Sequence, residues 1–234
     1  MTAVWKRELR SYLKSPVGYV YLFLFTVVSG FIFSMVNLNG YSADVSGFFG
    51  IASYLLILVV PLLTMKLFPE ERKNKTDQIL ITAPVNITGI VMGKFMAAYS
   101  MFLLSLIPSV FMMLFLAVKG NVEAGIMLSN YIGILLVGAA YIAIAMFMSC
   151  ITESQIIAFM MGFFTLLMFA VCELLKSLVN RSWFSKIIDV FSVSTRFTKL
   201  SSGLFDFSAI FYFISLTVVF LFLIVRIIDK RRWS

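Results

Sequence analysis

Histidine is absent from the 234-residue chain, and cysteine occurs only twice, at Cys150 and Cys172. Without an imidazole the chain lacks the commonest general base, and it has no Cys/His spacing of the kind that binds zinc. We therefore expect no structural metal and no histidine-based catalysis. Cys150 falls at the predicted inner end of the helix at 127–151, and Cys172 falls near the outer end of the helix at 154–175. A disulfide between them is therefore not expected.

Charged residues are also scarce, at 13% of the chain, whereas 61% of the residues are hydrophobic. This balance is far from that of a soluble domain. Six uncharged runs reach the roughly 20 apolar residues that cross a bilayer, at 15–43, 45–65, 95–118, 124–152, 154–172 and 207–225. The sequence thus predicts one all-α polytopic membrane domain over 1–234, with six transmembrane helices at 17–37, 48–67, 92–118, 127–151, 154–175 and 207–228.

Most basic residues fall on one side of these predicted helices. With the N-terminus inside, the cytoplasmic segments hold thirteen of the nineteen Lys and Arg residues, in agreement with the retention of positive loops in the cytoplasm. We therefore predict a multi-pass protein of the cytoplasmic membrane with both termini cytoplasmic. The net charge of +8 then reflects positive flanks near an anionic leaflet, and no nucleic-acid partner is expected.

The first fourteen residues, MTAVWKRELRSYLK, place apolar and basic side chains on opposite faces of a helix. Trp5, Leu9 and Tyr12 recur at helical spacing, and Arg7 lies on the basic face. This pattern predicts an amphipathic interfacial helix over 1–15, which rests on the cytoplasmic leaflet until Pro16 turns the chain into the membrane. The alternative is a basic flank that merely fixes the topology.

The predicted spans hold few groups that could bind a coupling ion. Transporters driven by ion gradients usually need ionisable residues at membrane depth, and Glu173 is the only acidic residue close to a span. Lys176 could neutralise it across one helical turn, so a structural pair and a substrate-path role both stay open. The nearest match to a phosphate loop, GIVMGKF at 89–95, fails in its glycine spacing and lacks the Ser or Thr that holds magnesium. Any ATP must therefore be hydrolysed by another polypeptide.

The stretch KLFPEERKNKTDQIL, residues 66–80, concentrates charge between two apolar runs. Its charged residues stand among apolar ones, so it can form a short polar helix across the mouth of the helices at 48–67 and 92–118. A charged element at that place suits contact with a cytosolic partner. A solvated loop that only supplies positive flanks fits the residues equally well.

The wider segment PLLTMKLFPEERKNKTDQILITAPVNITGIVMGKFMAAY, residues 61–99, resembles the signature region of type-2 ATP-binding cassette (ABC) transporter permeases. In that family a cytoplasmic coupling helix carries an acidic-acidic-Arg stretch, followed by a Thr, a Leu-rich turn, a Pro and a Gly-Lys pair. The matching residues here are Glu70, Glu71, Arg72, Thr76, Leu80, Pro84, Gly93 and Lys94. The chain is most similar to the gliding-motility ABC transporter permease branch, although Lys75 and Gln78 depart from the broad family pattern.

The resemblance implies an exporter subunit that performs no chemistry and binds no cofactor itself, while partner ABC ATPase subunits bind ATP and Mg²⁺. A second permease, identical or related, would complete the complex in a bacterial inner membrane. Region 68–88 would be the cytoplasmic coupling region, with Glu70, Glu71, Arg72, Lys73, Thr76, Asp77, Pro84 and Lys94 as coupling residues. Segment 177–206 would be a re-entrant extracytoplasmic hairpin, with Glu173 and Trp183 as candidates for an outer gate or substrate path.

Two other functions fit the same hydropathy. A membrane scaffold or assembly protein would share the apolar helices but would need no nucleotide-dependent change in them. An ion-coupled transporter would use Glu173 as its coupling group, and Glu173→Gln would then abolish its dependence on a gradient. Nothing in the sequence selects the cargo or the direction of transport.

Overall fold

The computed structural model describes residues 1–39, 43–74, 86–119, 122–178, 193–201, 203 and 206–232, without the side chains of 172–178, 231 and 232. Within these ranges every regular element is a helix and no strand is present. This confirms the predicted all-α class. The helices are α1 (Thr2–Lys14), α2 (Pro16–Phe33), the π-helical turn η1 (Ser34–Leu38), α3 (Val45–Thr64), α4 (Pro69–Lys73), α6 (Ile87–Lys119), α7 (Ala124–Ile151), α8 (Gln155–Leu178), α10 (Ser194–Ser201) and α11 (Phe207–Arg232).

Five of the described helical stretches are long and apolar enough to cross a membrane, namely Pro16–Leu38, Val45–Lys73, Ile87–Lys119, Ala124–Ile151 and Phe207–Lys230. The sixth predicted span, 154–175, corresponds to α8, whose apolar stretch within the described residues is shorter, at Gln155–Val171. Length and composition therefore confirm the membrane-like, multi-pass character of the chain. The six-span topology itself stays a prediction.

Local capping explains where several helices begin. Ser15 accepts a hydrogen bond from the Val17 backbone N–H at 3.3 Å, and Pro16 occupies the first helical position of α2, where a missing N–H has no cost. The Asp44 carboxylate accepts from the Gly47 N–H at 2.8 Å. Because this cap satisfies a free amide, α3 begins at Val45, three residues before the predicted start at 48.

The central helix of the bundle is α7, which contacts α3, α6, α8, α10 and α11. Small buried residues, among them Ala140, Ala143 and Ala145, let its neighbours approach closely. At Gly138 a Cβ would overlap the ring of Phe102 on α6. Glycine is therefore required there by the close approach of two helices.

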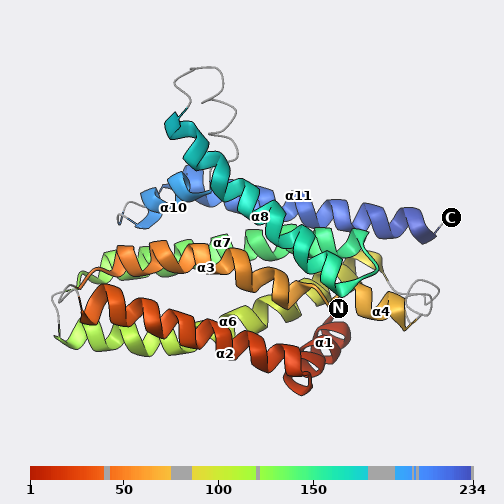
Figure 1. Cartoon of the computed structure of the whole chain (residues 1–234). Helices are drawn as coiled ribbons and strands as arrows, with labels where there is room; N and C mark the ends of the chain where they lie inside the picture. The colour runs from red at the N-terminus through yellow and green to blue at the C-terminus, as the bar shows by residue number, and fades with distance from the viewer. Residues whose placement is uncertain are drawn as a thin grey trace.

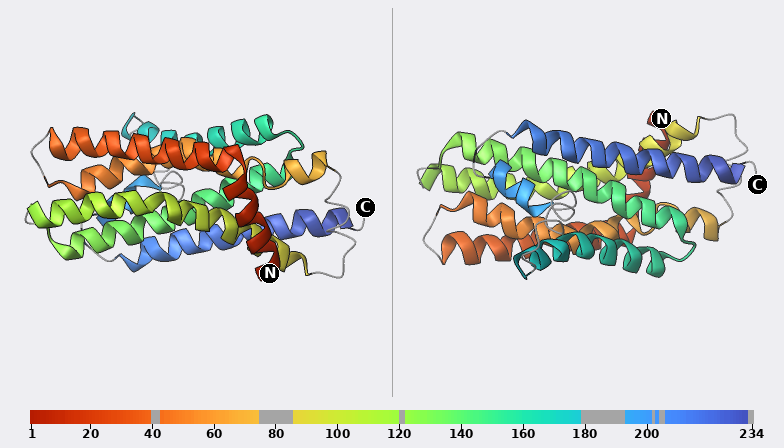
Figure 2. Two further views of the ribbon diagram at one scale, coloured as in Figure 1. Left: turned by 90° about the horizontal axis from the view of Figure 1, so that it is seen from below. Right: turned by 90° about the horizontal axis from the view of Figure 1, so that it is seen from above.

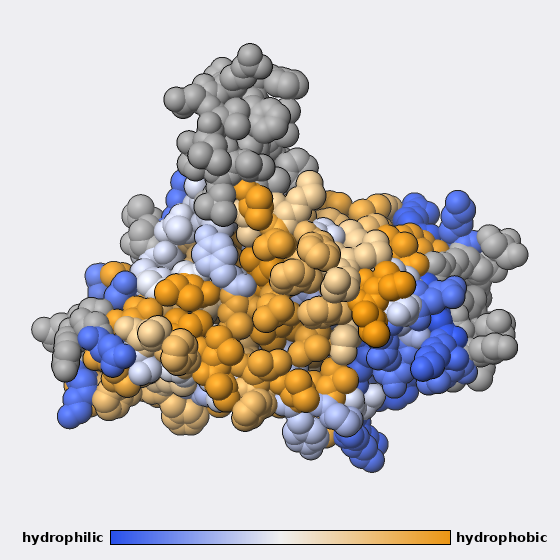
Figure 3. All heavy atoms as spheres, in the orientation of Figure 1, coloured by the Kyte–Doolittle hydropathy of each residue, from blue (hydrophilic) through white to orange (hydrophobic). Residues whose placement is uncertain are grey.

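The two ends of the bundle carry different elements (Figure 1). One end holds α4 and the C-terminal turns of α11, and α1 crosses the bundle there instead of running along it (Figure 2). We call it the α4 end, and the opposite end, which holds α10, the α10 end. On the face drawn in Figure 3, apolar side chains form a broad middle band and hydrophilic ones gather toward both ends. Both chain termini thus lie at the α4 end.

Candidate functional site

The short helix α4 is formed by residues suited to both of its ends. Pro69 occupies the first helical position, Glu70 and Glu71 lie in the first turn, and Arg72 and Lys73 lie in the last. Acidic residues at a helix N-terminus and basic ones at its C-terminus both complement the helix dipole. The described helix ends at Lys73, and residues 75–85 lie outside the described part of the predicted coupling region.

The side chains of α4 divide between two faces. Glu70 and Lys73, three positions apart, are exposed, whereas Glu71 and Arg72 are half-buried. Residues three apart share one helix face. The helix therefore presents one charged face outward and turns a second charged pair toward the bundle.

The inward carboxylate of Glu71 joins three helices through ion pairs. Its Oε2 lies 2.9 Å from the Nζ of Lys94 on α6, and its Oε1 accepts from the Nη2 of Arg7 on α1 at 2.6 Å. Glu8 on α1 completes the group, with its Oε1 at 2.6 Å from Arg7 and 3.3 Å from Lys94. We call these four residues, Arg7, Glu8, Glu71 and Lys94, the ionic cluster.

Lys94 is the most deeply buried member of the ionic cluster. Its side chain is 1% exposed, against 12% for Glu8, 16% for Glu71 and 52% for Arg7. Its Nζ also donates to the Leu67 carbonyl at 2.7 Å. Two cations face two anions, so the cluster is neutral overall, which is the condition under which charges tolerate burial.

The charges of the ionic cluster shift the pKa of one of its members, Glu8. Burial of Glu8 opposes its ionisation, but the positive charges of Lys94 and Arg7 outweigh this and lower the pKa of its carboxyl below the ordinary value. Glu8 is therefore held ionised, as the acceptor that keeps α1 against α6.

Arg72 fixes the other side of α4 to the central helix. Its Nη1 donates to the Thr152 carbonyl at 2.9 Å, and its Nη2 donates to the Cys150 carbonyl. Both acceptors lie at the C-terminal end of α7, where carbonyl groups lack partners within the helix. The guanidinium thus caps α7 while it anchors α4.

The apolar face of α1 packs on the bundle. The Trp5 indole N–H donates to the Ser100 hydroxyl of α6 at 3.0 Å, and the fully buried Tyr12 hydroxyl donates to the Leu63 carbonyl of α3 at 2.7 Å. Leu9 is partly buried against the same core. The three apolar residues predicted for an interfacial helix therefore lie together on the face that contacts protein.

Gly93 explains how α1 reaches Lys94. A Cβ at this position would lie 2.9 Å from the Cβ of Val4 and 3.1 Å from the Met1 carbonyl oxygen. Only glycine leaves room for the start of α1 on α6. The Gly-Lys pair of the sequence thus has two physical roles, which are close approach and charge pairing.

The remaining predicted site residues lie mostly outside the described chain. Thr76, Asp77, Pro84 and Trp183 belong to residues that the structure does not describe, and so does the side chain of Glu173, whose backbone lies in α8. The ionic cluster also contains Glu8, which was not among the predicted site residues. Its signal was available, because Glu8 is the only acidic residue among the first 43.

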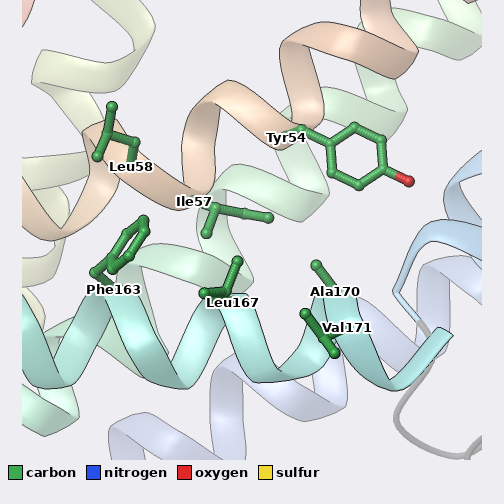
Figure 4. Close-up of a pocket in the computed structure, with 7 residues that line it drawn as sticks. All are labelled: Tyr54, Ile57, Leu58, Phe163, Leu167, Ala170 and Val171. Carbon is green, nitrogen blue, oxygen red and sulfur yellow. The ribbon is translucent and has the colours of Figure 1, made fainter. Parts of the chain in front are cut away.

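A hollow of about 350 Å³ lies between α3 and α8 (Figure 4). Its lining consists of Tyr54, Ile57, Leu58, Phe163, Leu167, Ala170 and Val171. The Tyr54 hydroxyl is the only polar side-chain group in this lining. Such a surface suits lipid or another apolar helix and offers nothing that would orient a charged molecule.

The charged residues of the α4 end join helices to one another through ion pairs and hydrogen bonds. Two carboxylates, one lysine and two arginines hold a five-residue helix against α1, α6 and α7.

No protein-family model and no curated protein matches this chain. The similarity of residues 61–99 to the ABC permease signature therefore stays a prediction.

Proposed function

We propose that this chain is the membrane-spanning permease subunit of an ABC exporter, in which separate ATPase subunits hydrolyse ATP. The observation that carries the proposal is the division of α4 into two charged faces. Glu70 and Lys73 are free to meet a partner, while Glu71 and Arg72 tie the same helix to the bundle. A solvated loop that only supplied positive charge would need no such anchorage.

In this proposal the ATPase subunits press on the outer face of α4 when they close around ATP. The ionic cluster transmits the displacement to α1 and α6, and Arg72 transmits it to the end of α7. Because α7 packs against most of the other helices, and packed interiors resist compression, a shift there rearranges the bundle as a whole.

The assembly and topology follow from the same proposal. The α4 end faces the cytoplasm, so both termini are cytoplasmic, and a second permease copy or relative completes the membrane part. ATP and Mg²⁺ bind to the ATPase partner. Thr76, Asp77 and Pro84 extend the coupling region, and Glu173 and Trp183 stay candidates for an outer gate.

The test asks whether the charges on the outer face of α4 are needed for ATPase binding. Tagged chains carrying Glu70→Lys or Lys73→Glu are isolated from native membranes in mild detergent, and their ATPase partner and vanadate-sensitive ATP hydrolysis are measured. We expect at least about tenfold less of both than in the wild type, because reversed charges oppose the complementary surface. Glu123→Lys is the matched control, since it reverses an exposed carboxylate at the α10 end.

Glu71 is less suitable for this test. Its reversal would place a third cation beside Lys94 and Arg7, and would disturb the chain itself before any partner bound. A wild-type chain that purifies alone and without ATPase activity would contradict the proposal and support the scaffold function. Equal losses with Glu123→Lys would also contradict it.

A further inference from the structure

A second hollow, of about 370 Å³, lies between α6 and α11 at the α4 end. This volume is within the range of small-molecule sites, which begins at about 300 Å³. Its lining consists of Thr88, Val91, Met92, Val218, Leu221, Phe222, Val225, Arg226 and Asp229. We call it the α6–α11 groove.

The α6–α11 groove is apolar along its length and charged at one end. Two residues of α6 and four of α11 form the apolar wall, and the polar groups Thr88, Arg226 and Asp229 stand together toward the α4 end. From Val218 to Arg226 the wall extends for about 12 Å, at 1.5 Å per helical residue. The groove therefore has the amphipathic form of a lipid, with its polar end near one end of the apolar band.

The two charges at this end carry no ion pair within the described chain. Arg226 is exposed, with its guanidinium carbon 5.0 Å from the centre of the Phe222 ring, and Asp229 is half-buried one turn further along α11. A cation and an anion are thus presented side by side, and both are available to a ligand.

We propose that the α6–α11 groove binds one phospholipid with a zwitterionic head group that bears a primary ammonium. One acyl chain lies along the apolar wall, the phosphate contacts Arg226, and the ammonium contacts Asp229. Both head-group charges are matched in this arrangement, whereas a lipid without an ammonium would leave the Asp229 carboxylate without a partner beside its phosphate. The proposal requires the bilayer but no ATPase, so it goes beyond the proposed transport function and is tested independently of it.

The experiment measures lipid binding to the full chain. The protein is purified in detergent, stripped of lipid, and titrated with phosphatidylethanolamine or phosphatidylglycerol, and the first bound lipid is quantified by native mass spectrometry. We expect phosphatidylethanolamine to bind about three- to fivefold more tightly, since one partly exposed charge pair contributes at most about 1 kcal/mol, which is a factor of about five. Asp229→Asn should remove this preference, and Arg226→Gln should weaken binding of both lipids.

A matched pair of variants tests the groove itself. Val218 lines it and Val219 does not, although both are more than half exposed. Neither change disturbs the core, so both variants should fold. Val218→Trp should fill the groove and lower binding of both lipids several-fold, while Val219→Trp should leave binding unchanged. Equal binding of the two lipids by the wild type, or equal effects of the two tryptophans, would overturn the proposal and indicate an unspecific lipid shell.

Discussion

Lys94→Met removes the buried cation that joins three helices at the α4 end. Methionine has similar length and fits a buried site, so the substitution deletes charge with little change of volume. Glu8 and Glu71 lose their shared partner, and the Leu67 carbonyl loses its donor. Arg7 still contacts both carboxylates.

The structure sets the expected magnitude. Removing one partner of a buried ion pair costs about 3–5 kcal/mol. The low end applies, because Glu8 and Glu71 keep 12% and 16% exposure and Arg7 still contacts both. A loss of about 3 kcal/mol lowers the melting temperature of a chain of this size by about 6–12 °C. The Trp5 indole, which contacts Ser100, should become more exposed to water as α1 loosens.

The assay is thermal unfolding of the purified chain in detergent. The contribution of Trp5 to the tryptophan emission is obtained by comparison with Trp5→Phe, because the chain also holds Trp183 and Trp233. Lys73→Met is the control, because it removes an exposed lysine from the same region and should shift the melting temperature by less than about 2 °C. In the double variant Glu71→Gln/Lys94→Met the two losses should be less than additive, by about 1 kcal/mol or more. Strict additivity, or a Lys94→Met protein as stable as the control, would refute the role given to the ionic cluster.

Three further changes test neighbouring features by the same unfolding measurement. Arg72→Gln should cost about 1–3 kcal/mol by leaving carbonyls at the end of α7 unpaired, whereas Lys73→Gln should be nearly neutral, and equal effects would contradict the capping role. Because the pKa of Glu8 is lowered in the folded chain, ionised Glu8 stabilises the fold fully above pH 4.5, its ordinary pKa, and this stabilisation is lost as the pH falls through the lower folded pKa. Glu8→Gln should therefore flatten the dependence of stability on acid pH, and an unchanged profile would contradict this role of Glu8. Gly138→Ala should cost about 1–3 kcal/mol through overlap with an aromatic ring of α6, whereas Gly50→Ala, with open space around it, should be neutral or slightly stabilising.

The helical, membrane-like character of this chain was determined by sequence alone. Long uncharged runs must satisfy their backbone amides internally, and helices do this without partners. The residues themselves also predicted the turn between α1 and α2, because Ser15 ends one helix and Pro16 begins the next. The start of α3 was less accessible, because its capping residue Asp44 stands four residues before the predicted start at 48.

Only the tertiary structure decided which charges pair. Glu8 and Lys94 are 86 residues apart, and nothing in the sequence indicates that they pair. The division of α4 into an inward pair and an outward pair depends on how that helix is rotated against α1 and α7, which no local pattern encodes. Sequence periodicity reports the neighbours of a residue within one or two turns, whereas an ionic cluster between helices depends on packing that brings distant segments together.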